Sequence, residues 1–241
     1  MNVIICKDLK AQGKAAASLF AAQMLAKRDS VLGFATGSSP LGTYDALAGL
    51  HARGALDFSS VRTFNLDEYV GMDPAHEQSY RRFMTENLFS RVNMPADHYR
   101  LPDGLAKDLD AECAAYEQAI RDAGGIDMQL LGIGHNGHIG FNEPGDTFPD
   151  ATHVVSLSER TIEANKRFFA SADEVPRQAI SMGIGTIMRA RAIVLIIGGA
   201  EKADITRQAL YGPVTPLVPA SILQFHQHVT VVLDEAAASK L

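Results

Sequence analysis

Apolar and polar positions alternate along the chain between two kinds of segment. The first kind is a short run of apolar, mostly β-branched residues, which is typical of a buried strand. The second kind is a longer stretch with apolar residues three or four positions apart, which is typical of an amphipathic helix. The strand-like runs are NVIIC (2–6), VLGFA (31–35), VRTFNL (61–66), IDMQLLGIG (126–134), HVVSL (153–157), AIVLIIGG (192–199) and VTVVLD (229–234). The helix-like stretches are 8–27, a segment from Pro40, 79–92, 106–123, 159–169 and 200–210.

This order of elements predicts the fold class. Strands that alternate with helices and are apolar nearly throughout are typical of a mostly parallel sheet with helices on both faces. The chain contains no internal repeat, linker or low-complexity segment, so residues 1–241 are expected to form a single α/β domain of the Rossmann-like kind. Ligands of such folds bind beyond the carboxyl ends of the strands, so the residues that follow each strand carry the candidate chemistry.

The composition narrows the range of partners. Apolar residues make up 46% of the 241 residues, and the formal net charge is −6. This charge argues against nucleic acid or an anionic membrane as a partner, whereas a small anionic ligand needs only local donors. No apolar run is long enough to span a membrane, and the start MNVIICKD lacks the pattern of a signal peptide. Cys6 and Cys113 have no metal-ligand spacing, so we expect free buried thiols and a cytoplasmic protein.

The segment TGSS (36–39) follows an apolar strand and precedes a helix. Gly37 allows the backbone to turn, Ser39 is expected to cap the helix, and Pro40 suits the first helical position. The free N–H groups of the helix start, with the hydroxyls of Thr36, Ser38 and Ser39, could bind an anion. An ordinary capped turn explains the same residues equally well. The Lys of a P-loop is absent, which argues against a nucleoside triphosphate.

Two other strand ends carry charged side chains. Asp67 and Glu68 follow the run VRTFNL directly, where either acid could serve as a general base or lie in a solvated turn. Lys202 is expected in the first turn of a helix, where the helix dipole disfavours a cation unless an anion binds there. Arg167 is a second candidate donor for such an anion, although either residue alone is more often a surface charge.

The run GIGHNGHIGFNEPG (132–145) contains the spacing G-x-G-x-x-G of a dinucleotide-binding loop. That loop must open a helix, yet the following residues have no helical period and contain Pro144 and Pro149, so we exclude a nicotinamide site here. The loop instead carries a histidine with a carboxylate five residues later, His138 and Glu143, which suits an acid–base histidine and its orienting partner.

Two other interpretations of this loop are open. His135, His138 and Glu143 could bind a metal ion, but their spacing matches no standard zinc pattern. The polar side chains could instead cap neighbouring backbone groups. Near the C-terminus, His226 and His228 are expected to lie on the surface.

Taken together, these motifs resemble the glucosamine-6-phosphate deaminase (glucosamine-6-phosphate isomerase) family. TGSSP, FNLDEYVG, SYRRFM, GIGHNGHIGFNEPG, NKRFF, MGIGT and GGAEKA occur in the order and spacing of that family over nearly the whole chain. The resemblance implies conversion of D-glucosamine 6-phosphate to D-fructose 6-phosphate and ammonia, with no metal and no organic cofactor. Related 6-phosphogluconolactonases share the fold and a similar histidine loop, but are not expected to combine FNLDEY with GHIGFNEP.

The resemblance also implies roles for individual residues. Asp67 resembles the base that moves a proton between C2 and C1, and His138 resembles the residue that assists ring opening. Glu143 and Asn136 resemble the groups that orient this histidine, and Asn136 replaces an aspartate found in some members. The implied phosphate pocket consists of Thr36, Gly37, Ser38, Ser39, Arg167 and Lys202. The implied lid spans about 148–172.

Three alternatives remain on this fold: a 6-phosphogluconolactonase, a galactosamine-6-phosphate deaminase and a non-catalytic sugar-phosphate sensor. Sensors carry a DNA-binding segment before this domain and often lose the acids, whereas this chain begins with the first strand and keeps them. Longer members of the family are hexamers activated by N-acetylglucosamine 6-phosphate through basic residues after NEP and a C-terminal extension. DATHVVSL contains no Lys or Arg and the chain ends soon after VTVVLD, so we expect a monomer or small homo-oligomer without that activation.

Overall fold

The computed structural model describes residues 1–157 and 175–241, and its main feature is a seven-stranded sheet. Every described strand pair in this sheet is parallel. In spatial order the strands are β1 (Asn2–Cys6), β10 (Val229–Asp234), β9 (Ala192–Ile197), β6 (Met128–Leu131), β2 (Val31–Phe34), β3 (Arg62–Asn65) and β5 (Tyr99–Arg100). The predicted mostly parallel α/β fold is therefore confirmed.

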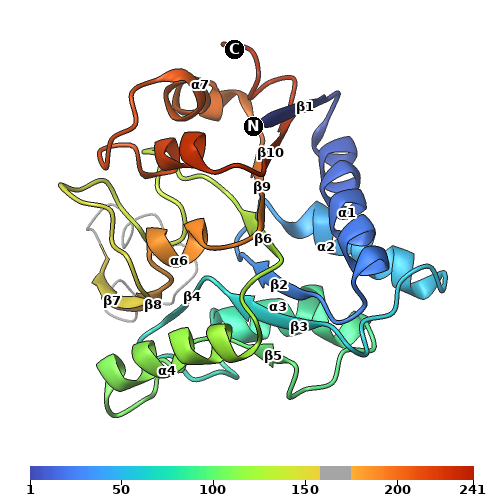
Figure 1. Cartoon of the computed structure of the whole chain (residues 1–241), viewed down its shortest axis with the longest axis vertical. Helices are drawn as coiled ribbons and strands as arrows, with labels where there is room; N and C mark the ends of the chain where they lie inside the picture. The colour runs from blue at the N-terminus through green and yellow to red at the C-terminus, as the bar shows by residue number, and fades with distance from the viewer. Residues whose placement is uncertain (158–174) are drawn as a thin grey trace.

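Helices cover both faces of this sheet (Figure 1). One face packs against α1 (Leu9–Ala26), α2 (Leu41–Ala52) and α3 (Tyr80–Asn87), which is followed by the short 3₁₀ helix η1 (Phe89–Arg91). The other face packs against α4 (Leu109–Asp122), α6 (Ile184–Met188), α7 (Ala203–Tyr211) and the 3₁₀ helix η5 (Pro219–Phe225). Another 3₁₀ helix, η4 (Ala200–Lys202), precedes α7. The predicted helix at 159–169 lies outside the described residues.

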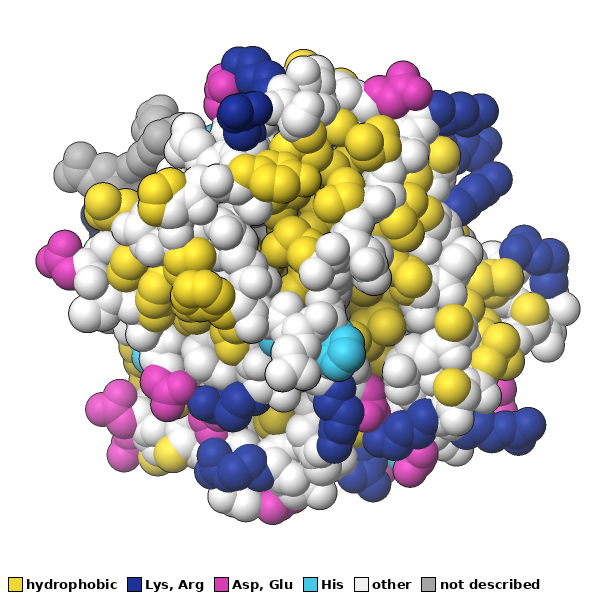
Figure 2. All heavy atoms as spheres, turned by 45° about the horizontal axis from the view of Figure 1, so that its top comes forward, with side chains coloured by type: hydrophobic (Ala, Val, Ile, Leu, Met, Phe, Trp, Pro, Cys, Tyr) yellow, Lys and Arg dark blue, Asp and Glu magenta, His cyan; other side chains and the backbone are white. Residues whose placement is uncertain are grey.

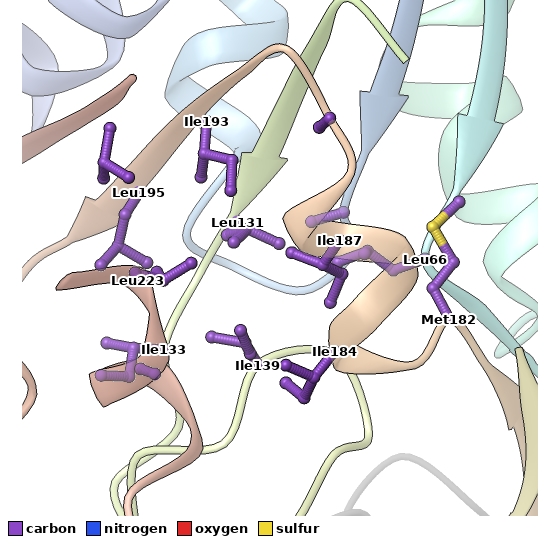
Figure 3. Close-up of a cluster of buried hydrophobic side chains, with 14 of the residues drawn as sticks. Leu66, Leu131, Ile133, Ile139, Met182, Ile184, Ile187, Ile193, Leu195 and Leu223 are labelled. Carbon is purple, nitrogen blue, oxygen red and sulfur yellow. The ribbon is translucent and has the colours of Figure 1, made fainter. Parts of the chain in front are cut away.

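Figure 3 shows the core on the second face, where side chains of central strands meet those of α6 and η5. Leu131 and Leu195 come from β6 and β9, Ile187 from α6 and Leu223 from η5, and all four are fully buried. Burial of a branched aliphatic side chain of this size stabilises the fold by about 1.5–3 kcal/mol. This packing fixes the carboxyl ends of the central strands, where the candidate chemistry lies.

A second, three-stranded antiparallel sheet was not predicted from the sequence. It contains β4 (Asp67–Tyr69), β8 (Gln178–Ser181) and β7 (His153–Ser156), in the order β4-β8-β7. The sequence leaves Asp67 and Glu68 open between a general base and a solvated turn and does not predict β4 or β8, because strands of three or four residues are too short to show alternation. Asp67 therefore lies on a hydrogen-bonded strand. Of the predicted lid, residues 158–172 lie outside the described residues, and 153–156 form β7.

The edge strand β1 exposes apolar side chains to solvent. Val3, Ile4 and Ile5 are 39%, 36% and 55% exposed, and Leu9 at the start of α1 is also exposed. Figure 2 brings the top of Figure 1 forward and shows apolar side chains gathered on that face. None of the described helices has the length and apolar character needed to cross a membrane. Cys6 and Cys113 are buried free thiols, as predicted.

Candidate active site

The carboxyl ends of the central strands surround a pocket of about 290 Å³. Its lining brings together segments that are far apart in sequence: Thr36–Ser39, Asp67, the 132–141 loop and Lys202. A larger groove of about 1130 Å³ is lined by residues of α1 and α2 and shares Ser38 and Ser39 with the pocket. The groove contains neither Asp67 nor His138, so we place the candidate chemistry in the smaller pocket.

Asp67 and Glu68, which the sequence left as alternative bases, have different environments. Asp67 lines the pocket and is only 5% exposed, and burial with the nearby Glu68 carboxylate raises its pKa to about 8. The Glu68 carboxylate instead accepts the N–H groups of Tyr69, Tyr80 and Arg81 at 2.9–3.0 Å. Two of these N–H groups belong to the first turn of α3, so Glu68 caps that helix. Asp67 is therefore the candidate base.

Residues 132–145, which we call the histidine loop, hold His138 beside a carboxylate. The distance between His138 Nδ1 and Glu143 Oε1 is 3.5 Å, slightly longer than an ordinary hydrogen bond. Nδ1 is buried and has no hydrogen-bond partner among the described residues. Asn136 Nδ2 donates to Glu143 Oε2 at 2.6 Å, and Asn136 Oδ1 accepts the His138 N–H at 3.3 Å. These contacts bring His138, Glu143 and Asn136 together, with Asn136 bonded to the Glu143 carboxylate and to the backbone of His138.

A close approach of backbone to the imidazole explains one glycine of this loop. A Cβ on Gly134 would stand 2.2 Å from His138 Cε1, closer than two carbon atoms can come. Gly137 has a φ of +88°, a conformation that glycine adopts readily. Between β6 and β7 the fully described residues 132–152 form no helix, so the helix that a dinucleotide-binding loop would open does not follow this strand.

The candidate anion loop, Thr36–Ser39, follows β2 and lies next to the end of β6, where a Cβ on Gly132 would stand 3.6 Å from Ser39 Cβ. Gly37 turns the chain with a φ of +88°. The predicted cap is wrong: α2 begins at Leu41, Pro40 is the residue before it, and no side chain caps the helix. The hydroxyl of Ser39 is therefore not committed to the end of α2, which favours the anion site over the ordinary capped turn.

Lys202 also reaches the pocket, although its setting differs from the prediction. It is the last residue of η4 and immediately precedes α7, so it does not lie within the first turn of a regular α-helix. Its Nζ donates to the carbonyl oxygen of Ile133 at 3.0 Å, which directs the ammonium group toward the histidine loop. Arg167, the other predicted cation, lies outside the described residues.

Tyr80 is a pocket residue that the sequence analysis missed. Its hydroxyl donates to the Tyr69 hydroxyl at 3.1 Å and is hydrogen bonded to the Thr36 side chain, and its ring stacks on Phe141 at an angle of 8°. Burial raises the pKa of Tyr80 well above its ordinary value. A single tyrosine at the start of a helix carries no sequence signal, so only its place in the fold identifies it.

Two further expectations concern the histidines near the C-terminus and metal binding. His226 is half-buried with Nε2 2.8 Å from the Ala190 carbonyl oxygen, so its predicted surface position is wrong, whereas His228 is exposed. In residues 1–157 and 175–241, no group of three or more His, Cys, Asp or Glu side chains is arranged to hold a metal ion.

Fold and pocket together define a parallel α/β protein that presents candidate acid–base groups and a candidate anion loop at the same strand ends. Residues 7–232 match the family of glucosamine-6-phosphate isomerases/6-phosphogluconolactonase. The chain belongs to this family, as its motifs predicted.

Relatives and solved structures place the chain within the family. It is 55% identical to the glucosamine-6-phosphate deaminase of Lachnoclostridium phytofermentans, over 96% of this chain and 98% of that protein. It is 54% identical to glucosamine-6-phosphate deaminase 2 of Bacillus subtilis, over 100% and 98%. A solved monomeric glucosamine-6-phosphate deaminase matches 100% of both chains with a TM-score of 0.96 and 44% identity. The 6-phosphogluconolactonase of Thermotoga maritima, with a TM-score of 0.75 and 21% identity over 97% of this chain and 98% of that one, shares the fold.

Proposed function

We propose that this chain is an enzyme that isomerises and deaminates D-glucosamine 6-phosphate, giving D-fructose 6-phosphate and ammonia. The observation that carries the proposal is the meeting of Asp67, His138 and Lys202 with the Thr36–Ser39 loop in one pocket. The relatives at 52–55% identity over nearly their full length are glucosamine-6-phosphate deaminases.

The pocket offers different groups to the two ends of the substrate. Lys202 and the Thr36–Ser39 loop supply an ammonium group, backbone N–H groups and hydroxyls for the phosphate. Arg167 is the second cation that we assign to the phosphate, by its motif alone. The reacting end of the sugar then lies toward Asp67 and His138, which line the same cavity.

The reaction starts with opening of the pyranose ring, which requires a proton to move between the anomeric hydroxyl and the ring oxygen. His138 performs this transfer as a general acid–base, and the Glu143 carboxylate, which accepts a hydrogen bond from Asn136, lies beside its imidazole. In the open chain, Asp67 removes the proton from C2 and returns it to C1, so that the amine-bearing carbon becomes an imine. Water adds to this imine and ammonia leaves.

The raised pKa of Asp67 matters for this step. A carboxylate with a pKa of about 8 is a stronger base than an ordinary aspartate, but it is mostly protonated at neutral pH in the empty pocket. The amino group of the substrate carries a positive charge when protonated. That charge beside Asp67 favours the ionised carboxylate. Binding of the amino sugar therefore favours the ionised form of Asp67, which is the form that can remove the C2 proton.

Two other enzyme activities and a non-catalytic role are the alternatives to this proposal. A galactosamine-6-phosphate deaminase would use the same residues and differ in how it accommodates one epimeric hydroxyl. A 6-phosphogluconolactonase would hydrolyse an ester and release no ammonia. A non-catalytic sensor has no need of a buried carboxylate and an oriented histidine in one pocket.

The assembly, the location and the regulation of the protein are part of the same proposal. We propose a monomer or small homo-oligomer in the cytoplasm, not activated by N-acetylglucosamine 6-phosphate. The similar solved protein at 44% identity is monomeric, and the segment DATHVVSL has no cationic residue for an activating phosphate. Light scattering and rates measured with and without the acetylated sugar phosphate test this. A hexamer, or a sigmoidal rate curve that the acetylated compound straightens, would contradict it.

The activity itself is tested by a coupled assay for ammonia and fructose 6-phosphate. We expect equal amounts of both from glucosamine 6-phosphate, less from the galactosamine epimer and no hydrolysis of 6-phosphogluconolactone. Faster ammonia release from the galactosamine epimer, or lactone hydrolysis without deamination, would replace the proposal with the corresponding alternative.

A further inference from the structure

The end of β8 carries a buried hydroxyl that the proposed reaction does not use. Ser181 is 0% exposed, and its Oγ accepts the N–H of Phe141 at 3.0 Å. Phe141 lies in the histidine loop, three residues beyond His138, and lines the pocket. The hydroxyl therefore joins the small antiparallel sheet to the loop that carries the histidine.

The same point of β8 is joined to the strand that carries the base. Ser181 lies directly opposite Asp67 in the antiparallel pairing of β4 with β8. Its neighbour Met182 donates its N–H to the carbonyl oxygen of Leu66 at 2.7 Å. Figure 3 shows Leu66 and Met182 close together at the edge of the buried cluster.

A second side chain closes this connection from the loop. Asn142 is buried, and its Nδ2 donates to the carbonyl oxygens of Ile139 and Met182 at 2.9 and 2.8 Å. Two buried hydrogen bonds, one accepted by the Ser181 hydroxyl and one donated by the Asn142 side chain, thus join the histidine loop to the end of β8. No described hydrogen bond joins the side chain of Asp67 directly to this loop, so the relative position of base and histidine depends on β8.

The fit around Gly140 shows how closely the loop approaches the base. A Cβ at this position would stand 3.0 Å from Ser181 Oγ and 3.6 Å from Asp67 Oδ2. The backbone of the loop therefore lies against the Asp67 carboxylate and keeps water from that side. If the loop moved away, Asp67 would become hydrated.

We propose that Ser181 is a positioning residue: its hydroxyl holds the histidine loop against Asp67 and so fixes the distance between the ring-opening histidine and the proton-transferring carboxylate. This inference rests on the proposed function. It assigns the small antiparallel sheet a task in catalysis, namely to hold the carboxylate on its own strand β4 beside the histidine on the loop that follows β6 of the large sheet.

The test is the variant Ser181→Ala, which removes the acceptor of the Phe141 N–H and leaves every charged group in place. We expect kcat to fall roughly 10- to 100-fold, because the two groups no longer meet the substrate together. We expect KM to stay within about twofold, because the phosphate-binding residues are not touched.

A pH profile separates this role from a merely structural one. The rise of kcat/KM with pH reports ionisation of Asp67 in the free enzyme, and a hydrated Asp67 has a lower pKa. We expect Ser181→Ala to move that rise to lower pH by about half a unit or more. The ionisable groups around Asp67 are the same in both proteins: Glu68 of β4, Tyr44 of α2, Tyr80 of α3, Tyr116 of α4, His135 and His138 of the loop, and Lys202 of η4.

Matched variants make the result decisive. Ser156→Ala changes an exposed serine of β7 in the same small sheet and should leave kcat and the pH profile unchanged. Asn142→Ala breaks the second connection and should shift the profile in the same direction, which keeps the test valid if Ser181→Ala folds poorly. A lower melting temperature with an unmoved profile, or wild-type kcat, would overturn the inference. Full activity of Asp67→Asn would instead overturn the proposed function.

Discussion

Asp67 and Glu68 are adjacent in the chain, yet their carboxylates serve opposite sides of the strand they share. Asp67 faces the pocket, whereas Glu68 accepts two N–H groups of the first turn of α3. Successive side chains of a strand point to opposite faces, so a pair of acids at a strand end is divided between two tasks. One acid is available for chemistry, and the other fixes the helix that brings Tyr80 to the pocket.

This division predicts different consequences for the loss of each acid. Glu68→Ala leaves the first N–H groups of α3 without their acceptor, and we expect a loss of about 0.5–2 kcal/mol in the free energy of unfolding. Chemical denaturation measures this loss, with Glu86→Ala on the exposed end of α3 as the control. Unchanged stability would show that Glu68 does not cap the helix.

Stability should also depend on pH through Asp67. Its pKa in the folded protein, about 8, lies above the ordinary value of 3.8, so the folded state favours the protonated acid. The corresponding stability is complete below about pH 4 and is lost as pH rises to about 8. Asp67→Asn cannot ionise. The melting temperature of this variant, relative to wild type, should therefore be higher at pH 9 than at pH 5, and an equal difference at both would contradict the buried position of Asp67.

The imidazole of His138 should be sensitive to the residue at position 134. A Cβ there would overlap the ring, so Gly134→Ala must displace it, and we expect kcat to fall roughly 100-fold or more. Gly132→Ala is the matched control in the same loop, because its Cβ would meet only Ser39 atoms at an ordinary 3.6 Å. Equal kinetics of the two variants would argue against a catalytic His138.

Lys202 should contribute mainly to affinity. A hydrogen bond to a charged group contributes about 1.5–3 kcal/mol, so Lys202→Ala is expected to raise KM by about 10- to 100-fold. The comparison is Lys240→Ala, whose exposed ammonium pairs with Asp204 away from the pocket. Steady-state kinetics distinguish the two, and an unchanged KM for Lys202→Ala would remove this residue from the phosphate site.

Much of the fold was predictable, for a physical reason. Strands buried on both faces are apolar throughout, so β2, β6 and β9 stand out from their surroundings even in a single sequence. The small sheet was not predictable in this way, because β4 pairs with β8 across more than a hundred residues and both are very short. The exact ends of helices, such as the uncapped start of α2, depend on tertiary packing.

The residues of the candidate site were also only partly predictable from the sequence. Asp67, His138 and Glu143 could be proposed because ionisable residues gather beyond apolar strands, and their motifs match a family. Ser181 and Tyr80 could not, because a serine in a strand and a tyrosine in a helix look like ordinary residues until the fold brings Tyr80 to the pocket and Ser181 to the backbone of Phe141.

The central claim is that Asp67 moves the proton of the amine-bearing carbon. The most direct measurement is ammonia and fructose 6-phosphate formed from glucosamine 6-phosphate by wild type and by Asp67→Asn, with substrate binding followed by calorimetry. We expect wild type to form both products and the variant to bind the sugar phosphate but turn over about 10²–10⁴-fold more slowly. Turnover of the variant at the wild-type rate would contradict the account.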